Sequence, residues 1–135
     1  MKLDLKLLGY VNVFETKTRT SVKDCFFDQK ECLVFIVNPG FGYKAIGKGG
    51  VVVKKLNFLF KKRIKVIEFS NDPVVFVKNI LYPLKPCDVL LRDNNLVIKA
   101  EGTYNKALLI GRDKRNLNNL KSIFSKFYEY SIVIE

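Results

Sequence analysis

The sequence contains no histidine, so the side chain that most often serves as a general base or a metal ligand near neutral pH is missing. Its cysteines are few: Cys25, Cys32 and Cys87 show no C-x-x-C spacing, which argues against a zinc or iron–sulfur site. An odd number of scattered cysteines is typical of a reduced, intracellular chain. We therefore expect a cytoplasmic protein with no metal and no cofactor.

Acidic residues and long apolar runs are also scarce. The 135 residues include 13 Asp and Glu against 24 Lys and Arg, a net charge of +11. A domain this basic most often binds nucleic acid, and less often an acidic protein or membrane surface. Residues 1–6 alternate charge and leucine without a long apolar segment, so we expect neither a signal peptide nor a membrane span.

What the chain does contain is a glycine-rich stretch, Ile46-Gly47-Lys48-Gly49-Gly50, followed by a lysine-rich helical pattern. Glycines lack the Cβ atom that would keep another backbone away. The following helix would direct its free N–H groups and the positive end of its dipole at the same spot. Such a loop is suited to hold a phosphodiester backbone.

Hydrophobic spacing and turn residues predict the order helix–strand–strand–helix–loop–helix–strand twice. The first set covers residues 4–17, 22–28, 32–37, 42–46, 51–61 and 64–69, although the alternation of Leu3, Leu5 and Leu7 leaves a strand start open. In the second set, Asp72-Pro73 begins a helix whose apolar face is Val74, Val77, Ile80 and Leu81. Strands at 89–92 and 96–100 follow, then a short helix capped by Thr103, a helix over 116–127 and a strand over 130–134.

Individual residues repeat along with the elements. Six positions of the first half recur 64 positions later, namely Ile46, Gly47, Lys48, Val53, Leu56 and Phe60 as Ile110, Gly111, Arg112, Leu117, Leu120 and Phe124. This indicates a duplicated α+β fold with a first domain of residues 1–70 and a second of residues 71–135. We expect a monomer.

Three phosphate-binding motifs compete for residues 40–50. Gly42, Gly47 and Lys48 satisfy the P-loop pattern G-x-x-x-x-G-K, but Gly49 stands where that loop needs a serine or threonine for magnesium. The stretch from Gly40 to Ala45 fits a loose dinucleotide fingerprint, yet the glycines after it would break the crossover helix. The third motif is a G-x-x-G loop between two helices, the second of them basic.

This third motif resembles the signature of a KH domain of the prokaryotic type (type II). Four stretches together are similar to the archaeal NusA-like transcription factors: Val22-Lys23-Asp24-Cys25, Ala45-Ile46-Gly47-Lys48-Gly49-Gly50, Ser70-Asn71-Asp72-Pro73 and Ile110-Gly111-Arg112-Asp113. The resemblance implies two tandem type II KH modules (αββααβ), each a three-stranded sheet covered by helices. It also implies single-stranded RNA binding, a role in transcription termination or antitermination, and no catalytic activity.

In KH modules the G-x-x-G loop clamps the backbone of about four nucleotides. Carried onto this sequence, the clamp is Gly47, Lys48, Gly49 and Gly50, and Ile46 and Val51 border the groove for the bases. Lys44 and Lys54 lie within about one helical turn of the glycines, where we expect them to contact RNA. They belong to a run of eight basic residues without an acidic one: Lys44, Lys48, Lys54, Lys55, Lys61, Lys62, Arg63 and Lys65.

The second loop, Gly111-Arg112-Asp113-Lys114, departs from this pattern. Lys114 replaces the last glycine, and Asp113 places a negative charge where a phosphate would lie. Gly111, Arg112, Lys114 and Arg115 form a second candidate RNA site, and a basic turn kept for packing is the alternative.

A different class of function is a protein-interaction adaptor that docks its basic face on RNA polymerase or on a ribonucleoprotein. An enzyme is the least favoured class, because Asp72, Asp88 and Asp93 are explained as cap and turn residues and no nucleophile–base pair is visible. The preferred RNA sequence and the polymerase contact surface stay open.

Overall fold

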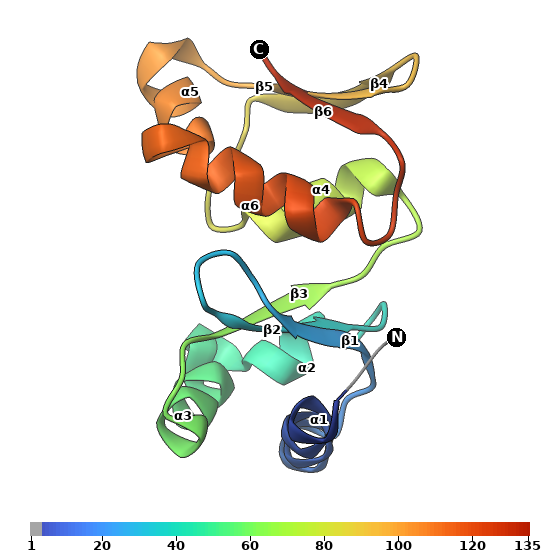
Figure 1. The fold of residues 1–135 in the computed structure, drawn as a ribbon, viewed down its shortest axis with the longest axis vertical. Coiled ribbons are helices and arrows are strands. Elements are labelled where there is room, and N and C mark those ends of the chain that lie inside the picture. The colour runs from blue at the N-terminus through green and yellow to red at the C-terminus, as the bar shows by residue number, and fades with distance from the viewer. Residues whose placement is uncertain (1–3) are drawn as a thin grey trace. The chain divides into compact units, whose positions relative to one another are not determined.

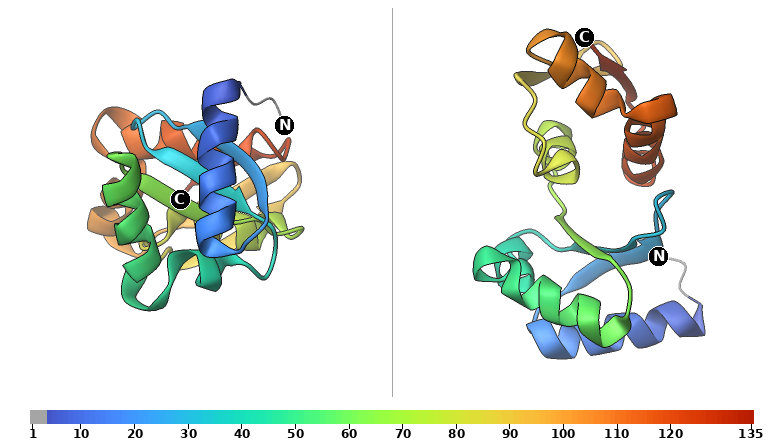
Figure 2. Two further views of the ribbon diagram at one scale, coloured as in Figure 1. Left: turned by 90° about the horizontal axis from the view of Figure 1, so that it is seen from below. Right: turned by 90° about the vertical axis from the view of Figure 1, so that its left-hand side faces the viewer.

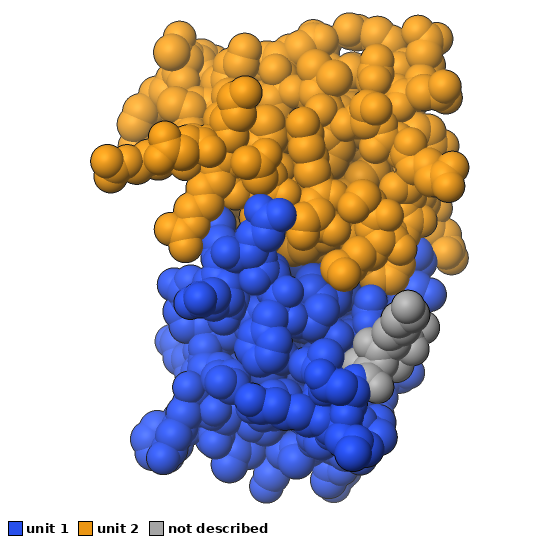
Figure 3. Space-filling view, viewed as in Figure 1, with its two compact units in different colours: residues 1–70 blue, residues 71–135 orange. Residues whose placement is uncertain are grey.

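A computed structural model describes residues 4–135 (Figure 1). The chain divides into two compact units, one ending at Ser70 and one beginning at Asn71 (Figure 3). Each unit is an α+β module that contains one three-stranded sheet with helices packed on it. The two tandem modules therefore have the duplicated fold that the repeat predicts and the KH-like architecture that the resemblance implies.

The first unit follows the predicted order of elements. Its helices and strands are α1 (Leu5–Thr18), β1 (Val22–Phe27), β2 (Leu33–Val37), α2 (Gly42–Ile46), the 3-10 turn η1 (Lys48–Gly50), α3 (Val51–Phe60) and β3 (Ile64–Glu68). Leu5 and Leu7 lie in α1, so the alternative of a strand at this point is wrong for them; Leu3 lies outside the described residues.

The second unit repeats this order. Its elements are α4 (Pro73–Leu81), β4 (Asp88–Arg92), β5 (Asn95–Lys99), α5 (Gly102–Ile110), the 3-10 turn η2 (Arg112–Lys114), α6 (Arg115–Phe124) and β6 (Ser131–Ile134). The two turns η1 and η2 and the helices α3 and α6 that follow them are related by an offset of 64 residues, the same offset that the sequence repeat shows.

Both sheets have the same mixed topology. In the order β1-β2-β3, the central strand β2 pairs antiparallel with β1 and parallel with β3. In the order β4-β5-β6, β5 pairs in the same two ways. Because parallel strands need a crossover, the chain must pass over the sheet between them. The two helices and the glycine loop of each unit make up that crossover.

Polar side chains set several of the element boundaries. Asp4 accepts a hydrogen bond from the Leu7 N–H at 2.8 Å and caps α1, and Asp72 caps α4 by accepting from the Val74 N–H at 2.9 Å. The buried Asp28 carboxylate accepts the N–H groups of Lys30 and Cys32, each at 2.9 Å, and so closes the β1–β2 hairpin. These local hydrogen bonds explain why the sequence predicts these boundaries well.

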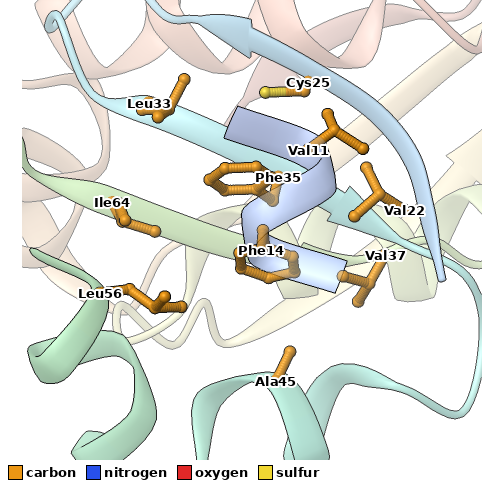
Figure 4. Packing of buried hydrophobic residues seen from close by; sticks show 10 residues of the cluster. All are labelled: Val11, Phe14, Val22, Cys25, Leu33, Phe35, Val37, Ala45, Leu56 and Ile64. Carbon is orange, nitrogen blue, oxygen red and sulfur yellow. The ribbon is translucent and has the colours of Figure 1, made fainter. Parts of the chain in front are cut away.

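The core of the first unit lies between its sheet and its helix layer (Figure 4). The left-hand view of Figure 2 looks onto that layer, where α1, α2 and α3 cross the sheet. Phe14 of α1 stacks on Phe35 of β2 with 4.0 Å between ring centroids and 10° between ring planes, and both are fully buried. Leu33, Val37, Ala45 and Leu56 are among the residues around this pair.

The core of the second unit is centred on Phe76 of α4. Its ring contacts Phe124, Phe127 and Tyr128, with centroid distances of 6.2, 5.4 and 6.0 Å. Phe76 is fully buried, whereas Val74, which the sequence assigned to the apolar face, is half-buried. Val77, Ile80 and Leu81 are buried as predicted, so the apolar face of α4 is confirmed apart from Val74 and is extended by Phe76.

Two predicted boundaries of the second unit are wrong. Helix α5 begins at Gly102 after the N-cap residue Glu101, so Thr103 lies inside the helix and is not its cap. Helix α6 ends at Phe124 rather than Phe127, because Lys126 and Phe127 donate their N–H groups to the carbonyls three residues before them in tight turns. Those turns lead the chain into β6, which begins at Ser131.

All three cysteines are free. Cys25 lies opposite Phe35 in the β1–β2 register and is buried, and therefore does not face Cys32. Burial, together with the nearby carboxylates of Asp24 and Asp4, raises the pKa of the Cys25 thiol to about 12. This thiol stays protonated at neutral pH and serves as a small core side chain. None of the helices in residues 4–135 has both the length and the apolar character needed to cross a bilayer.

The stacked pair at the centre of the first unit generates a stability prediction. We expect Phe35→Leu to lower the free energy of unfolding by about 1–2 kcal/mol, because it removes the aromatic pair with Phe14 and leaves a small void. Urea denaturation followed by circular dichroism measures the change. Phe27→Leu in the neighbouring strand is the control, since Phe27 is 44% exposed and its truncation should cost little. Equal losses in the two variants would contradict the assigned core.

Candidate nucleic-acid interface

The glycine loop joins α2 to α3 through a backbone that uses positive φ angles at three of four positions. Gly47 has φ 78° and ψ 164°, Gly49 has φ 65° and Gly50 has φ 75°. Left-handed backbone costs an L-residue roughly 1–2 kcal/mol, which glycine avoids. The N–H of Gly47 donates to the Tyr43 carbonyl at 2.8 Å, and that of Gly50 donates to the Gly47 carbonyl at 3.1 Å. The loop therefore has a defined shape held by its own backbone.

The three glycines serve two different purposes. A Cβ atom on Gly47 would lie 2.6 Å from Cγ2 of Val52 and 3.0 Å from its backbone nitrogen, so Gly47 permits α2 and α3 to pack closely. Cβ atoms on Gly49 and Gly50 would meet nothing within 4 Å. These two glycines leave the outside of the loop open, where another backbone can approach.

The start of α2 is anchored from the sheet. The N–H of Gly42 donates to Oε1 of Glu68 in β3 at 2.9 Å, and a Cβ atom on Gly42 would lie 2.6 Å from that oxygen. A carboxylate at a helix N-terminus also interacts favourably with the helix dipole. Sequence reasoning missed Glu68; its signal is that it is the first acidic residue after the basic run that begins at Lys44.

Exposed lysines surround the loop. Lys44 on α2, Lys48 in the loop and Lys54 on α3 are all exposed, and none of them forms an ion pair with a carboxylate in residues 4–135. Ile46 is half-buried and Val51 is 45% exposed, so the first-unit site combines positive charge with a small apolar border. Tyr43 is 75% exposed, whereas Phe41 packs against the core.

The second loop has nearly the same backbone as the first. Gly111 has φ 77° and ψ 169°, Asp113 has φ 54° and ψ 32°, and Lys114 has φ 59° and ψ 24°. The N–H of Gly111 donates to the Ala107 carbonyl at 2.8 Å, and that of Lys114 to the Gly111 carbonyl at 3.2 Å. The shape of the first loop is thus kept although two of its glycines are replaced.

The close helix contact is also kept in the second unit. A Cβ atom on Gly111 would lie 2.9 Å from the backbone nitrogen of Asn116, which stands 64 positions after Val52. The side-chain amide of Asn116 donates to the Leu108 carbonyl of α5 at 2.8 Å. In the first unit Val52 packs against Gly47. In the second unit Asn116 packs against Gly111 in the same way and adds a hydrogen bond between α5 and α6.

Comparisons with known proteins place this architecture in a family. No protein-family model matches the chain. A Methanocaldococcus jannaschii protein named "Probable transcription termination protein NusA" is 30% identical over 142 residues, which cover 100% of this chain and 76% of that protein. The chain belongs to the archaeal NusA-like family. A Methanococcus vannielii protein of the same name is 37% identical over 100 residues, which cover 73% of this chain and 57% of the relative.

The fold of this NusA-like chain also matches a solved structure. The crystal structure of APE1850 aligns with a TM-score of 0.75 at 30% identity, and the alignment covers 98% of this chain and 100% of APE1850. The tandem arrangement described above is therefore shared along nearly the whole chain.

The expected site residues of the NusA-like chain form two groups on equivalent elements. The first lies on α2, the loop and α3, and comprises Lys44, Ile46, Gly47, Lys48, Gly49, Gly50, Val51 and Lys54. The second lies on η2, its flanking glycine and the first residue of α6, and comprises Gly111, Arg112, Lys114 and Arg115. Among residues 4–135, no cluster of three or more side chains suited to a metal ion occurs.

The different roles of the glycines can be tested by stability. We expect Gly47→Ala to destabilise the protein by about 2–4 kcal/mol, because the new methyl group collides with Val52 in addition to the strain of positive φ. Gly49→Ala should cost only about 1 kcal/mol, the strain alone. Urea denaturation of both variants measures the difference, and equal losses would refute the close-packing role of Gly47.

Proposed function

We propose that this NusA-like chain binds single-stranded RNA and acts in transcription, at the level of termination or antitermination. The observation that carries the proposal is the loop from Gly47 to Gly50, which is open on its outer side and carries Lys48 at its exposed tip. The name shared by the archaeal relatives supports the transcription role. RNA polymerase is the proposed protein partner.

The proposed RNA contact uses the backbone of the loop. The positive end of the α3 dipole lies at the loop, which favours a phosphate there. Gly49 and Gly50 let the sugar–phosphate chain approach without a side chain in the way. We propose that the bases then lie beside Ile46 and Val51, the apolar residues that flank the loop. We propose that the chain acts by binding rather than by catalysis, since this site consists of a glycine loop, lysines and apolar groups.

Electrostatics supports the same ligand. No acidic residue occurs between Lys44 and Lys65, and the exposed Lys44, Lys48 and Lys54 have no carboxylate partner in the described part of the chain. Each phosphate that these lysines neutralise releases counterions, with a salt slope of roughly −0.7 per contact for single strands. We propose that this unbalanced charge supplies most of the sequence-independent affinity.

We propose the second loop as a weaker RNA site. Its backbone has the clamp shape, and Arg112, Lys114 and Arg115 are exposed. Asp113 is exposed at the position of Gly49 and opposes the phosphate. One such negative charge offsets on the order of 1 kcal/mol, the gain from one neighbouring cation.

The first loop can be tested by reversing its charge. We expect Lys48→Asp combined with Gly49→Asp to remove the binding of short single-stranded RNA by the first loop and to leave only the weaker affinity of the second loop, measured by fluorescence anisotropy at two salt concentrations. The fold should survive, because Asp113 already occupies the equivalent left-handed position in the second loop. Lys6→Asp with Asn12→Asp is the control, since both sites are exposed on α1 and the net charge changes equally.

The outcomes separate the candidate functions. Tight binding by the wild type and the control, with much weaker binding by the loop variant, supports the clamp. Equal binding by all three proteins would contradict it. No RNA binding by the wild type, together with a stable complex with RNA polymerase, would support the adaptor function instead.

The second loop is tested by removing one charge. We expect Asp113→Asn to tighten RNA binding by about 1 kcal/mol, because it removes the repulsion and asparagine tolerates a left-handed backbone at least as well. The measurement uses the Lys48→Asp/Gly49→Asp background, so that the first loop does not mask the second. Unchanged affinity there would show that the second loop is a packing turn.

A further inference from the structure

The outer face of α3 is the surface formed by Val51, Lys54, Lys55, Phe58, Lys61 and Lys62. Val51 to Phe58 belong to α3, and Lys61 and Lys62 follow it directly. At helical spacing Val51, Lys54, Lys55 and Phe58 lie on the side opposite the core-facing Leu56, and the left-handed Lys61 ends the helix. The face begins where the glycine loop ends and extends about 15 Å along the ten residues of the helix.

Phe58 is the unusual residue of this face. Its side chain is 87% exposed, whereas Leu56, two residues earlier, is 3% exposed and belongs to the core cluster. Val52, Val53 and Phe60 supply the remaining apolar contacts of α3 with that core. An exposed phenylalanine therefore adds nothing to the packing of the unit, and a large ring in water has a surface that a ligand can cover.

The charges around Phe58 indicate which kind of ligand this face can bind. Lys54 lies four residues and Lys55 three residues before Phe58, so both are its neighbours on the helix surface. Lys61 and Lys62 follow the end of the helix at Phe60 and continue the positive charge there. Lys54, Lys55 and Lys61 are exposed and form no ion pair with carboxylates in the described chain. An aromatic ring among unpaired lysines is complementary to single-stranded nucleic acid, whose phosphates are anionic and whose bases stack.

The far end of the face carries a second ring. The Lys62 ammonium lies 5.6 Å from the centroid of the Phe27 ring of β1, and Phe27 is 44% exposed. Charge and exposed aromatic surface therefore continue beyond the end of α3. The surface is also continuous with the proposed clamp, because Val51 is both the first residue of α3 and a neighbour of Gly50.

We propose that the RNA strand held by the glycine loop continues along the outer face of α3, where Phe58 stacks on a base and Lys54, Lys55 and Lys61 contact phosphates. This inference rests on the proposed RNA-binding function and extends its footprint beyond the loop. It assigns to Phe58 a ligand contact that neither the fold nor the G-x-x-G motif requires.

The test compares two RNA lengths. Fluorescence anisotropy measures the affinity of the full chain for an oligouridine of about four nucleotides, the length of a KH clamp, and for one of about ten. We expect the longer RNA to bind more tightly and with a steeper salt dependence. Phe58→Ala should weaken the longer RNA about tenfold, the size of one lost base stack, and leave the shorter one unchanged.

Three further variants make the test specific. Phe58→Tyr should retain the affinity for the longer RNA, because it keeps the ring, and Phe58→Leu should lose it. Tyr104→Ala is the matched control, since Tyr104 is an aromatic residue of α5 that is 75% exposed and lies in the other unit. Circular dichroism should show that all four variants fold, because both side chains are exposed.

The outcomes distinguish this inference from the function on which it rests. If the wild type binds both RNAs and Phe58→Ala binds them equally well, the extended footprint is overturned and the clamp stands. Full affinity of Phe58→Leu would overturn base stacking. If Phe58→Ala weakens the shorter RNA to the same extent, Phe58 acts at the clamp itself and the extension is wrong. If the wild type binds neither RNA, the proposed function fails and this inference fails with it.

Discussion

The close packing of two helices at a single glycine underlies the rest of each module. At Gly47 a Cβ atom would strike both the side chain and the backbone of Val52, so α2 and α3 can meet only because this residue has none. That contact fixes the turn between the helices, and the turn brings the loop to the N-terminus of α3. The two helices then complete the crossover from β2 to the parallel strand β3. This packing contact therefore positions the loop at the start of α3, within the crossover that joins the two parallel strands.

The second unit shows how little of the loop sequence this geometry requires. Gly111 repeats the close contact with Asn116, and the following backbone adopts the same left-handed angles through Asp113 and Lys114. Each of these two residues bears strain that a glycine would avoid. The duplicated fold has therefore preserved the shape of the loop while changing its charge, so that two similar backbones present different chemistry to a polyanion.

Much of the fold could be predicted from the sequence, because the deciding interactions are local. The 3.6-residue spacing of Leu7, Val11 and Phe14 marks α1, and the Asp72-Pro73 pair marks the start of α4. The predictions fail where tertiary contacts compete with local preference. Phe76 was not among the residues assigned to the apolar face of its helix, yet it is buried because Phe124, Phe127 and Tyr128 surround it. Thr103 has a hydroxyl that suits an N-cap, but α5 begins at Gly102 with Glu101 at the N-cap position. Thr103 therefore lies inside the helix.

The sequence by itself determined the order of the elements, their duplication at an offset of 64 residues, the excess of positive charge and the position of the glycine loop. These properties depend on neighbouring residues and on composition, which are visible without a structure. Only the tertiary structure decided that Gly47 is packed while Gly49 and Gly50 are open, that Glu68 anchors α2 from 26 residues away, and that Phe58 faces solvent. The reason is physical: each of these depends on the space around a residue, and that space is bounded by side chains from other parts of the chain.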